Sequence, residues 1–112
     1  PQLLREELES PQAKRRMRAL RVIAAMDLAK DLEEAVLLRA DDDDHLVRVE
    51  AVRVLAGLTT ASTQEKLLAL AADSSFAVRE AAWNAIEESG RGSGLSLEEL
   101  ERLRESFSEQ AD

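Results

Sequence analysis

The sequence predicts an all-α solenoid of about three two-helix repeats, followed by a C-terminal capping helix. The 112-residue chain is 45% hydrophobic and 34% charged but only 3% aromatic, which is typical of helices that pack through small side chains. In addition, a pattern of aspartate, valine–arginine, alanine and an aliphatic residue recurs at a fixed interval. Such periodicity indicates stacked copies of one supersecondary unit.

The repeat is clearest between two segments that are offset by 31 positions. The first segment carries Asp42, Val47, Arg48, Ala51 and Leu55, and the second carries Asp73, Val78, Arg79, Ala82 and Ile86. A weaker copy with a slightly longer offset comes earlier, at Ser10, Arg16, Ala19 and Ile23. We therefore expect three units, at about 1–27, 28–59 and 60–89.

Each unit is expected to begin with a short helix. Asp31-x-x-Glu34 and Ser62-x-x-Glu65 are capping-box patterns, and each precedes an apolar run. The first helices are therefore predicted over 32–40 and 63–72.

The second helix of each unit is expected to follow a polar turn. Asp42 and Asp73 are candidate caps for helices that start near Asp43 and Ser74. Ser10 followed by Pro11 is the corresponding start signal in the first unit. Apolar side chains then cover a wide stripe, which predicts burial on two sides. In the second unit this stripe consists of Leu46, Val47, Ala51, Val52, Val54, Leu55 and Leu58.

The spacing of the aspartate, the valine–arginine pair, the alanine and the aliphatic residue resembles the HEAT-repeat signature. It covers roughly residues 3–89, and the absence of proline early in the first helices makes the bacterial, PBS-lyase-type HEAT-like repeats the closer match. Armadillo repeats fit less well, since they have a third helix and a longer period. The resemblance implies a right-handed α-α superhelix. It also implies a structural ladder of hydrogen bonds from unit to unit, formed by Asp42, Arg48, Asp73 and Arg79.

The C-terminal part of the chain departs from the repeat. Residues 90–95 are rich in glycine and serine, and we expect them to be a linker that ends the preceding helix. Ser96-x-x-Glu99 is a third capping box, and it predicts an amphipathic helix over 96–109. Its apolar face would consist of Leu97, Leu100, Leu103 and Phe107. We favour a cap over the last repeat, and the alternative is the first helix of a further unit.

Charge and composition argue against several classes of protein. The net charge of −8 argues against nucleic-acid binding, although residues 1–30 carry seven basic and four acidic side chains. No apolar run approaches the ~20 residues that span a membrane, and the absence of cysteine suits a reducing, cytoplasmic location. Because the chain opens with Pro1 and not Met, we expect a fragment or a processed product.

The sequence predicts no catalytic residue, cofactor site or metal site. His45 stands beside Asp41–Asp44, a combination that could ligate a metal ion, but consecutive carboxylates on a turn diverge. We favour a solvated capping turn there. The Gly90–Gly94 run lacks the Lys-Ser/Thr ending of a phosphate-binding loop, and a single histidine without cysteine assembles no nucleophilic triad.

Trp83 is the one tryptophan of the chain. Its register equivalents are Val52 and Leu20, so we expect it in the core, packed against the tail helix through Leu100, Leu103 or Phe107. Exposed, it would be a strong binding anchor.

The candidate partner-binding residues lie on the second helices, which the HEAT resemblance places on the concave face. Basic side chains cluster between Lys14 and Arg21, and their register equivalents extend the cluster along the array. The candidates are Arg18, Arg21, Arg53 and Asn84. The alternative is a solvated surface, neutralised by Glu6, Glu7 and Glu9.

These observations favour a non-catalytic interaction or scaffold module that binds another protein or a peptide. The alternative is a protein associated with an enzyme, such as a phycobilin-lyase-like HEAT protein. HEAT-like DNA glycosylases fit less well, because the chain has little positive charge and no aromatic stacking platform. The sequence leaves the oligomeric state open.

Overall fold

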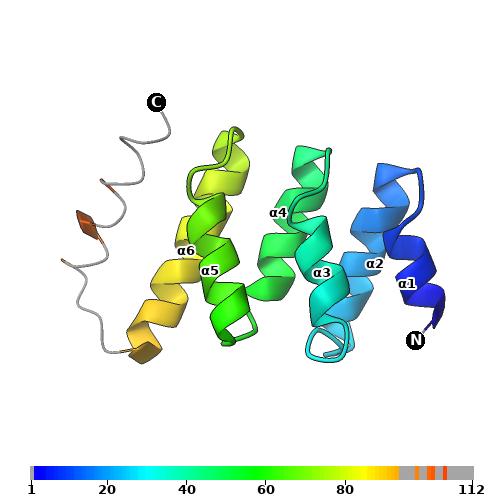
Figure 1. The fold of residues 1–112 in the computed structure, drawn as a ribbon, viewed down its shortest axis with the longest axis horizontal. Coiled ribbons are helices and arrows are strands. Elements are labelled where there is room, and N and C mark those ends of the chain that lie inside the picture. Colours follow the sequence, from blue (N-terminus) through cyan, green and yellow to red (C-terminus); the bar gives the residue numbers. More distant parts are fainter. Residues whose placement is uncertain (1, 94–97, 99–100, 103–104, 106–112) are drawn as a thin grey trace.

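The computed structural model describes residues 2–93, 98, 101, 102 and 105, and the regular structure in this part of the chain is all helical. Residues 2–93 form α1 (Gln2–Leu8), α2 (Ala13–Ala25), α3 (Glu33–Arg39), α4 (His45–Leu55), α5 (Ala61–Leu70) and α6 (Phe76–Ser93). The helices pair in chain order and the three pairs stand side by side (Figure 1). The predicted all-α solenoid of two-helix units is therefore confirmed.

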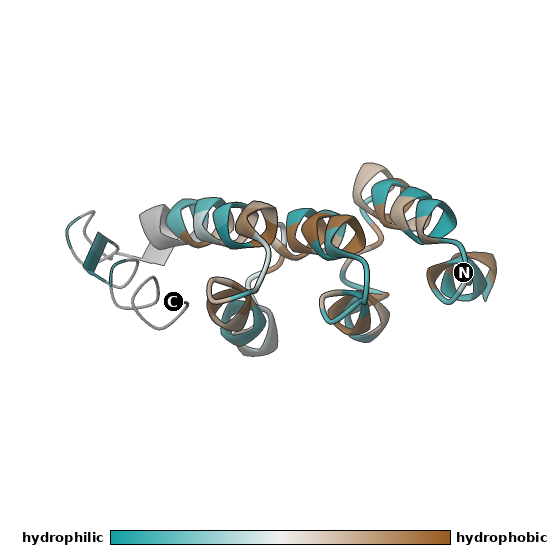
Figure 2. Ribbon diagram, turned by 90° about the horizontal axis from the view of Figure 1, so that it is seen from above, coloured by the Kyte–Doolittle hydropathy of each residue, from teal (hydrophilic) through white to brown (hydrophobic). Residues whose placement is uncertain are grey.

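The three pairs build two layers. Viewed from above, α1, α3 and α5 form one layer, and α2, α4 and α6 form the other (Figure 2). Each first helix packs on the second helix of its own unit, while α2 packs on α4 and α4 on α6. A continuous core lies between the layers, as in other solenoids whose units cannot bury their apolar faces alone.

One register position shows how the units share this core. Leu20, Val52 and Trp83 occupy equivalent sites on α2, α4 and α6, and all three are buried. Trp83 is only 2% exposed, so its prediction as a core residue is confirmed. Its expected contacts with Leu100, Leu103 and Phe107 lie outside the described residues.

The apolar stripe of α4 is buried with one exception. Val47, Ala51, Val52, Val54 and Leu55 are buried, but Leu46 is exposed. Leu46 lies in the first turn of α4, at the edge of the layer, so the predicted stripe was too wide there.

The predicted caps of the first helices were wrong. α3 begins after Leu32 with no side-chain cap. The N–H of Leu32 already donates to the carbonyl of Leu28 at 3.1 Å, so a backbone turn leads into this helix without Asp31. α5 begins one residue after Thr60, whose hydroxyl accepts the N–H of Thr63 at 3.2 Å, so Ser62 lies inside the helix.

The cap of α4 also differs from the prediction. Asp44 accepts the N–H groups of Leu46 and Val47 at 2.8 and 3.3 Å, and its extended backbone places it directly before the helix. Asp42 lies two residues too early for this role. In a run of four aspartates, only the one next to the first helical residue reaches the free N–H groups.

The predicted linker at 90–95 was wrong in its first part, because α6 continues through Gly90 to Ser93. A glycine costs a helix about 1 kcal/mol but, unlike proline, removes no backbone donor. The penalty is thus small enough for the helix to continue.

The predicted helix 96–109 is described only in part. Residues 98, 101, 102 and 105 are helical, and Arg102 lies 4.0 Å from Glu98. Leu97, Leu100, Leu103 and Phe107 lie outside the described residues, so the capping role stays a prediction.

Candidate interaction surface

The turn between the two helices of each unit is built in the same way three times. A polar side chain at the start of the turn accepts a hydrogen bond from the backbone N–H two positions later. Ser10 accepts from Gln12, Asp42 from Asp44, and Asp73 from Ser75. The arginine six positions after it donates Nη1 to the carbonyl of that same residue. These bonds run from Arg16 to Ser10, from Arg48 to Asp42 and from Arg79 to Asp73, at 2.7, 2.7 and 2.8 Å.

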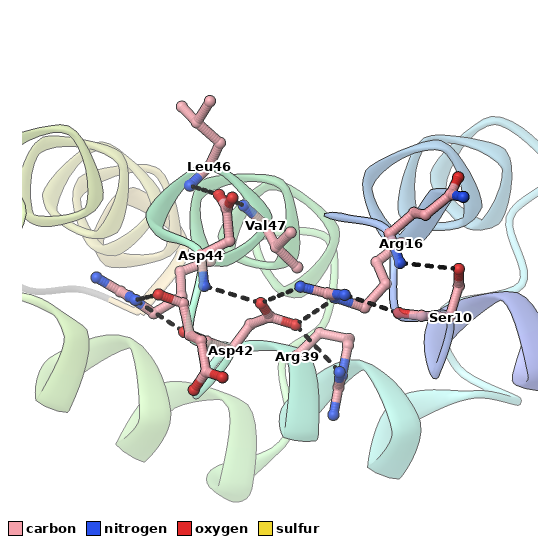
Figure 3. A network of polar contacts seen from close by, with 10 residues as sticks. Ser10, Arg16, Arg39, Asp42, Asp44, Leu46 and Val47 are labelled. Carbon is pink, nitrogen blue, oxygen red and sulfur yellow. Dashed lines mark hydrogen bonds and ion pairs between the residues drawn. The ribbon is translucent and has the colours of Figure 1, made fainter. Parts of the chain in front are cut away.

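The arginine of one unit also reaches the aspartate of the next. Arg16 donates Nε and Nη2 to the two carboxylate oxygens of Asp42, both at 2.9 Å (Figure 3). Arg39 adds a third bond to Asp42 at 3.0 Å. The Asp42 side chain is only 2% exposed, so its charge is compensated almost entirely by these two arginines.

The surroundings of Asp42 shift its ionisation. Burial by itself would raise the pKa of this carboxyl, but the hydrogen bonds from Arg16 and from the N–H of Asp44, with the charges of Arg16 and Arg39, lower it below its ordinary value. The hydrogen bond to Asp42 likewise raises the pKa of Arg16. The pair is thus charged throughout the neutral range.

The second contact between units is looser. Arg48 Nη2 donates to Asp73 Oδ2 at 3.1 Å. Arg48 Nε lies 3.1 Å from Oδ1, close enough for an ion pair, but it is not aligned for a hydrogen bond and is otherwise buried without a partner. The Asp73 side chain is 12% exposed. The unit of Asp73 has Leu70 at the position equivalent to Arg39, so this position cannot supply the bond that Arg39 makes to Asp42.

Arg79 is the last arginine of this series. Its guanidinium lies 5.8 Å from the centre of the exposed Phe76 ring, within cation–π range. The structure thus brings the four residues proposed for a ladder, Asp42, Arg48, Asp73 and Arg79, into one connected network with Arg16 and Arg39.

The candidate partner-binding residues Arg18, Arg21, Arg53 and Asn84 are all exposed, on α2, α4 and α6. We call the surface that carries them the second-helix face. Arg21 donates Nε and Nη2 to Glu50 Oε1 at 3.1 Å, and Arg53 donates Nη1 to the same oxygen at 3.2 Å. Two of the four candidates are therefore held together by one carboxylate.

Glu50 was missed as a functional residue by the sequence analysis. Its side chain is only 8% exposed, although a lone glutamate on an amphipathic helix usually indicates a solvated site. The available signal was its register: Glu50 stands where the other units have Arg18 and Ala81, and Arg21 of the preceding unit lies 29 positions before it.

A groove runs between α4 and α6 on the same face. Because α6 has Ala81 where α4 has Glu50, the space beside Arg53 lacks a carboxylate at that register position. Val49 and Val52 form the floor, Arg53 stands on the α4 rim, and Glu80, Asn84 and Glu88 line the α6 side. We call this the α4–α6 groove.

Comparison with protein-family models matches residues 32–112 to the model described as HEAT repeats. The chain belongs to the HEAT-repeat family. Proteins of this family generally act as protein-interaction scaffolds and are typically non-catalytic. The match starts in the second unit, and α1 and α2 extend the HEAT array with the same turn and the same arginine contact. Comparisons with curated proteins and with solved structures found no match.

The acidic turn of the HEAT array is engaged in structural contacts. Asp42 joins the first two units, Asp44 caps α4, and Asp41 pairs with Lys66 Nζ at 2.8 Å, while His45 is exposed. Among the residues that the structure describes, no three histidine or acidic side chains gather as a metal-binding group. These contacts support the interpretation of the run as a capping turn.

A second polar contact was also missed by the sequence analysis. Thr63 is fully buried and donates its hydroxyl to Glu33 Oε1 at 3.1 Å, and Thr60 donates to the same oxygen. The contact joins α3 to α5 and satisfies a hydroxyl that would be costly to bury alone.

In the part of the chain that the structure describes, no helix is both long enough and apolar enough to cross a bilayer.

Proposed function

We propose that the chain is a non-catalytic interaction module that binds another protein or a peptide on the second-helix face, the concave side of the array. The observation that carries this proposal is the gathering of exposed polar side chains on successive second helices. Arg21, Arg53 and Asn84 occupy equivalent positions, and Arg18 stands three residues before Arg21. No observation in the described part of the chain favours the enzyme-associated alternative.

Charge supports this choice of face. The whole chain carries a net charge of −8, yet three of the four candidate side chains on the second-helix face are arginines. A local positive region on an acidic protein steers partners of opposite charge and suppresses wrong orientations. Arginine also forms bidentate bonds with carboxylates, which favours its use in interfaces.

The packing of the array supports it as well. Because α2 packs on α4 and α4 on α6, the second helices present one continuous surface to a partner. The contacts between Arg16 and Asp42 and between Arg48 and Asp73 hold the units in register. A partner thus meets a surface that needs little ordering on binding.

Site-specific photo-crosslinking tests the proposal. A photoreactive phenylalanine would replace Arg18 or Asn84 on the second-helix face, and Glu34 or Glu65, both exposed on the first helices, as matched controls. Each variant would be shown to be folded by circular dichroism and irradiated in lysate of the source organism. We expect a discrete partner protein to be captured from Arg18 and Asn84 and not from the controls. Capture from the controls alone, or from none of the four positions, would contradict the proposal.

A further inference from the structure

The two junctions between units differ at one register position. At the first junction, Glu50 of α4 receives Arg21 from the preceding unit. At the second junction, Arg53 is the equivalent of Arg21, and Ala81 of α6 is the equivalent of Glu50. The arginine is retained while the carboxylate that would receive it from the next unit is absent.

The α4–α6 groove occupies the space that this difference leaves. Its floor consists of Val49 and Val52, and Arg53 stands on the α4 rim with its side chain 67% exposed. Between Val49 and Ala56 the α4 rim is about 10 Å long, roughly two helical turns. The groove therefore has room for a few residues of a polypeptide.

The chemistry of the rims defines what fits. Among the described residues Arg53 donates one hydrogen bond, from Nη1 to Glu50, and a guanidinium has five donors in a planar fork. A carboxylate from outside can take a bidentate position on that fork, as the Asp42 carboxylate does on Arg16. On the α6 side Asn84 offers an amide, and the carboxylates of Glu80 and Glu88, one turn to either side of it, favour basic groups.

We propose that the α4–α6 groove binds a peptide segment of the partner protein that carries an acidic residue with basic residues near it. The carboxylate pairs with Arg53 in the way that Glu50 pairs with Arg21, and the basic side chains meet Glu80 and Glu88. Small apolar side chains next to the carboxylate pack on Val49 and Val52. The inference rests on the proposed function, because it specifies where on the second-helix face the partner binds and through which chemistry.

The test uses peptides selected from a random 16-residue display library against the full 112-residue chain. Selected peptides would be synthesised with a fluorophore and titrated by fluorescence polarisation. Ala81→Glu supplies the missing carboxylate from within the chain, and Ala81→Gln has the same size without the charge. Glu65→Gln, at an exposed position of α5, is the matched control, and Arg18→Glu tests the same face in the first unit. Circular dichroism and thermal melting would establish that every variant is folded.

We expect the selected peptides to share an acidic residue, and its replacement by the amide to weaken binding about tenfold, as for loss of one charge-assisted hydrogen bond. Ala81→Glu should weaken binding at least as much, and more than Ala81→Gln. Glu65→Gln should leave it within about twofold, because Glu65 lies on a first helix, outside the groove.

Other results separate the inference from the proposed function. Peptides that lose binding to Arg18→Glu and bind Ala81→Glu as tightly as the wild type would overturn the groove and leave the second-helix face as the binding surface. Peptides that are insensitive to both variants would contradict both. Selected peptides without acidic residues, or a selection that yields no binder, would overturn the inference.

Discussion

The junction between the first and second units and the junction between the second and third use the same helices in the same register, yet different contacts hold them. At the first, Asp42 receives both Arg16 and Arg39, and Glu50 receives Arg21. At the second, Asp73 receives Arg48 alone from the preceding unit, and Ala81 offers no carboxylate at all.

The apolar core also changes along the array. Trp83 occupies the position of Val52 and is just as buried, so a large ring replaces a small side chain there. One repeat pattern thus yields junctions with different polar contacts through a few substitutions at equivalent positions. A groove opens at the second junction without any change of fold, because Ala81 stands where the second unit has a long side chain.

The largest effect is expected at Trp83. Trp83→Ala should lower the free energy of unfolding by about 4 kcal/mol, because it removes a large buried ring and leaves a cavity. Val52→Ala, at the same register position in the second unit, should cost about 2 kcal/mol. Urea unfolding followed by circular dichroism measures both, since the first variant lacks the only tryptophan. An equal or smaller loss for Trp83→Ala would show that the ring stabilises the core no more than the valine does.

The next effect distinguishes the two aspartates. Asp42→Asn should cost about 3 kcal/mol, because it leaves two arginines around a buried site without their carboxylate. Asp73→Asn should cost about 1 kcal/mol, since that pair is more exposed and less well aligned. Chemical unfolding at pH 7 measures the difference. A larger loss for Asp73→Asn would reverse the ranking of the junctions.

Acid should act on the first junction through Asp42. Its pKa is lowered in the folded protein, so as pH falls the unfolded state binds the proton first and acid favours unfolding. The stability difference between the wild type and Asp42→Asn should stay constant from pH 7 to 5. It should then shrink below about pH 4, the ordinary range of an aspartate. Unfolding curves at several pH values measure it, with the exposed Asp43→Asn as the control. A difference that persists unchanged to pH 2 would contradict the assigned shift.

The smallest effect is expected at Glu50. Glu50→Gln should cost about 1 kcal/mol, because its two arginines lie mostly in solvent and lose little when the charge is removed. The loss should diminish in 0.5 M salt, which screens exposed charges. Thermal unfolding at low and high salt measures both values. A loss as large as that of Asp42→Asn would place the main polar contact of the first junction at Glu50.

The sequence predicted the repeat well and its local contacts less well. The constant offset between Asp42 and Asp73 was enough to place the units, because burial on both sides of a second helix forces the same residue types into each copy. The helix starts were misplaced where several capping residues stand within two positions of each other, as at Thr60 and Ser62. Which of them caps depends on the backbone of the turn, and sequence spacing does not encode it.

Two further differences have other physical causes. Glu50 was missed because its two arginine partners lie on α2 and α4, and Arg21 comes beside it only once these helices are packed. The end of α6 was misplaced because the glycine penalty is small beside the contacts of a long helix.

The central claim is that a partner binds where the junction lacks its carboxylate. The most direct test exchanges that feature between the junctions, in the double variant Glu50→Ala with Ala81→Glu. Hydrogen exchange would be measured with and without an acidic peptide selected on the wild type. The account predicts protection along α4 and α6 in the wild type, and along α2 and α4 in the exchanged variant. Protection that stays at α6 after the exchange, or that never depends on these two positions, would contradict it.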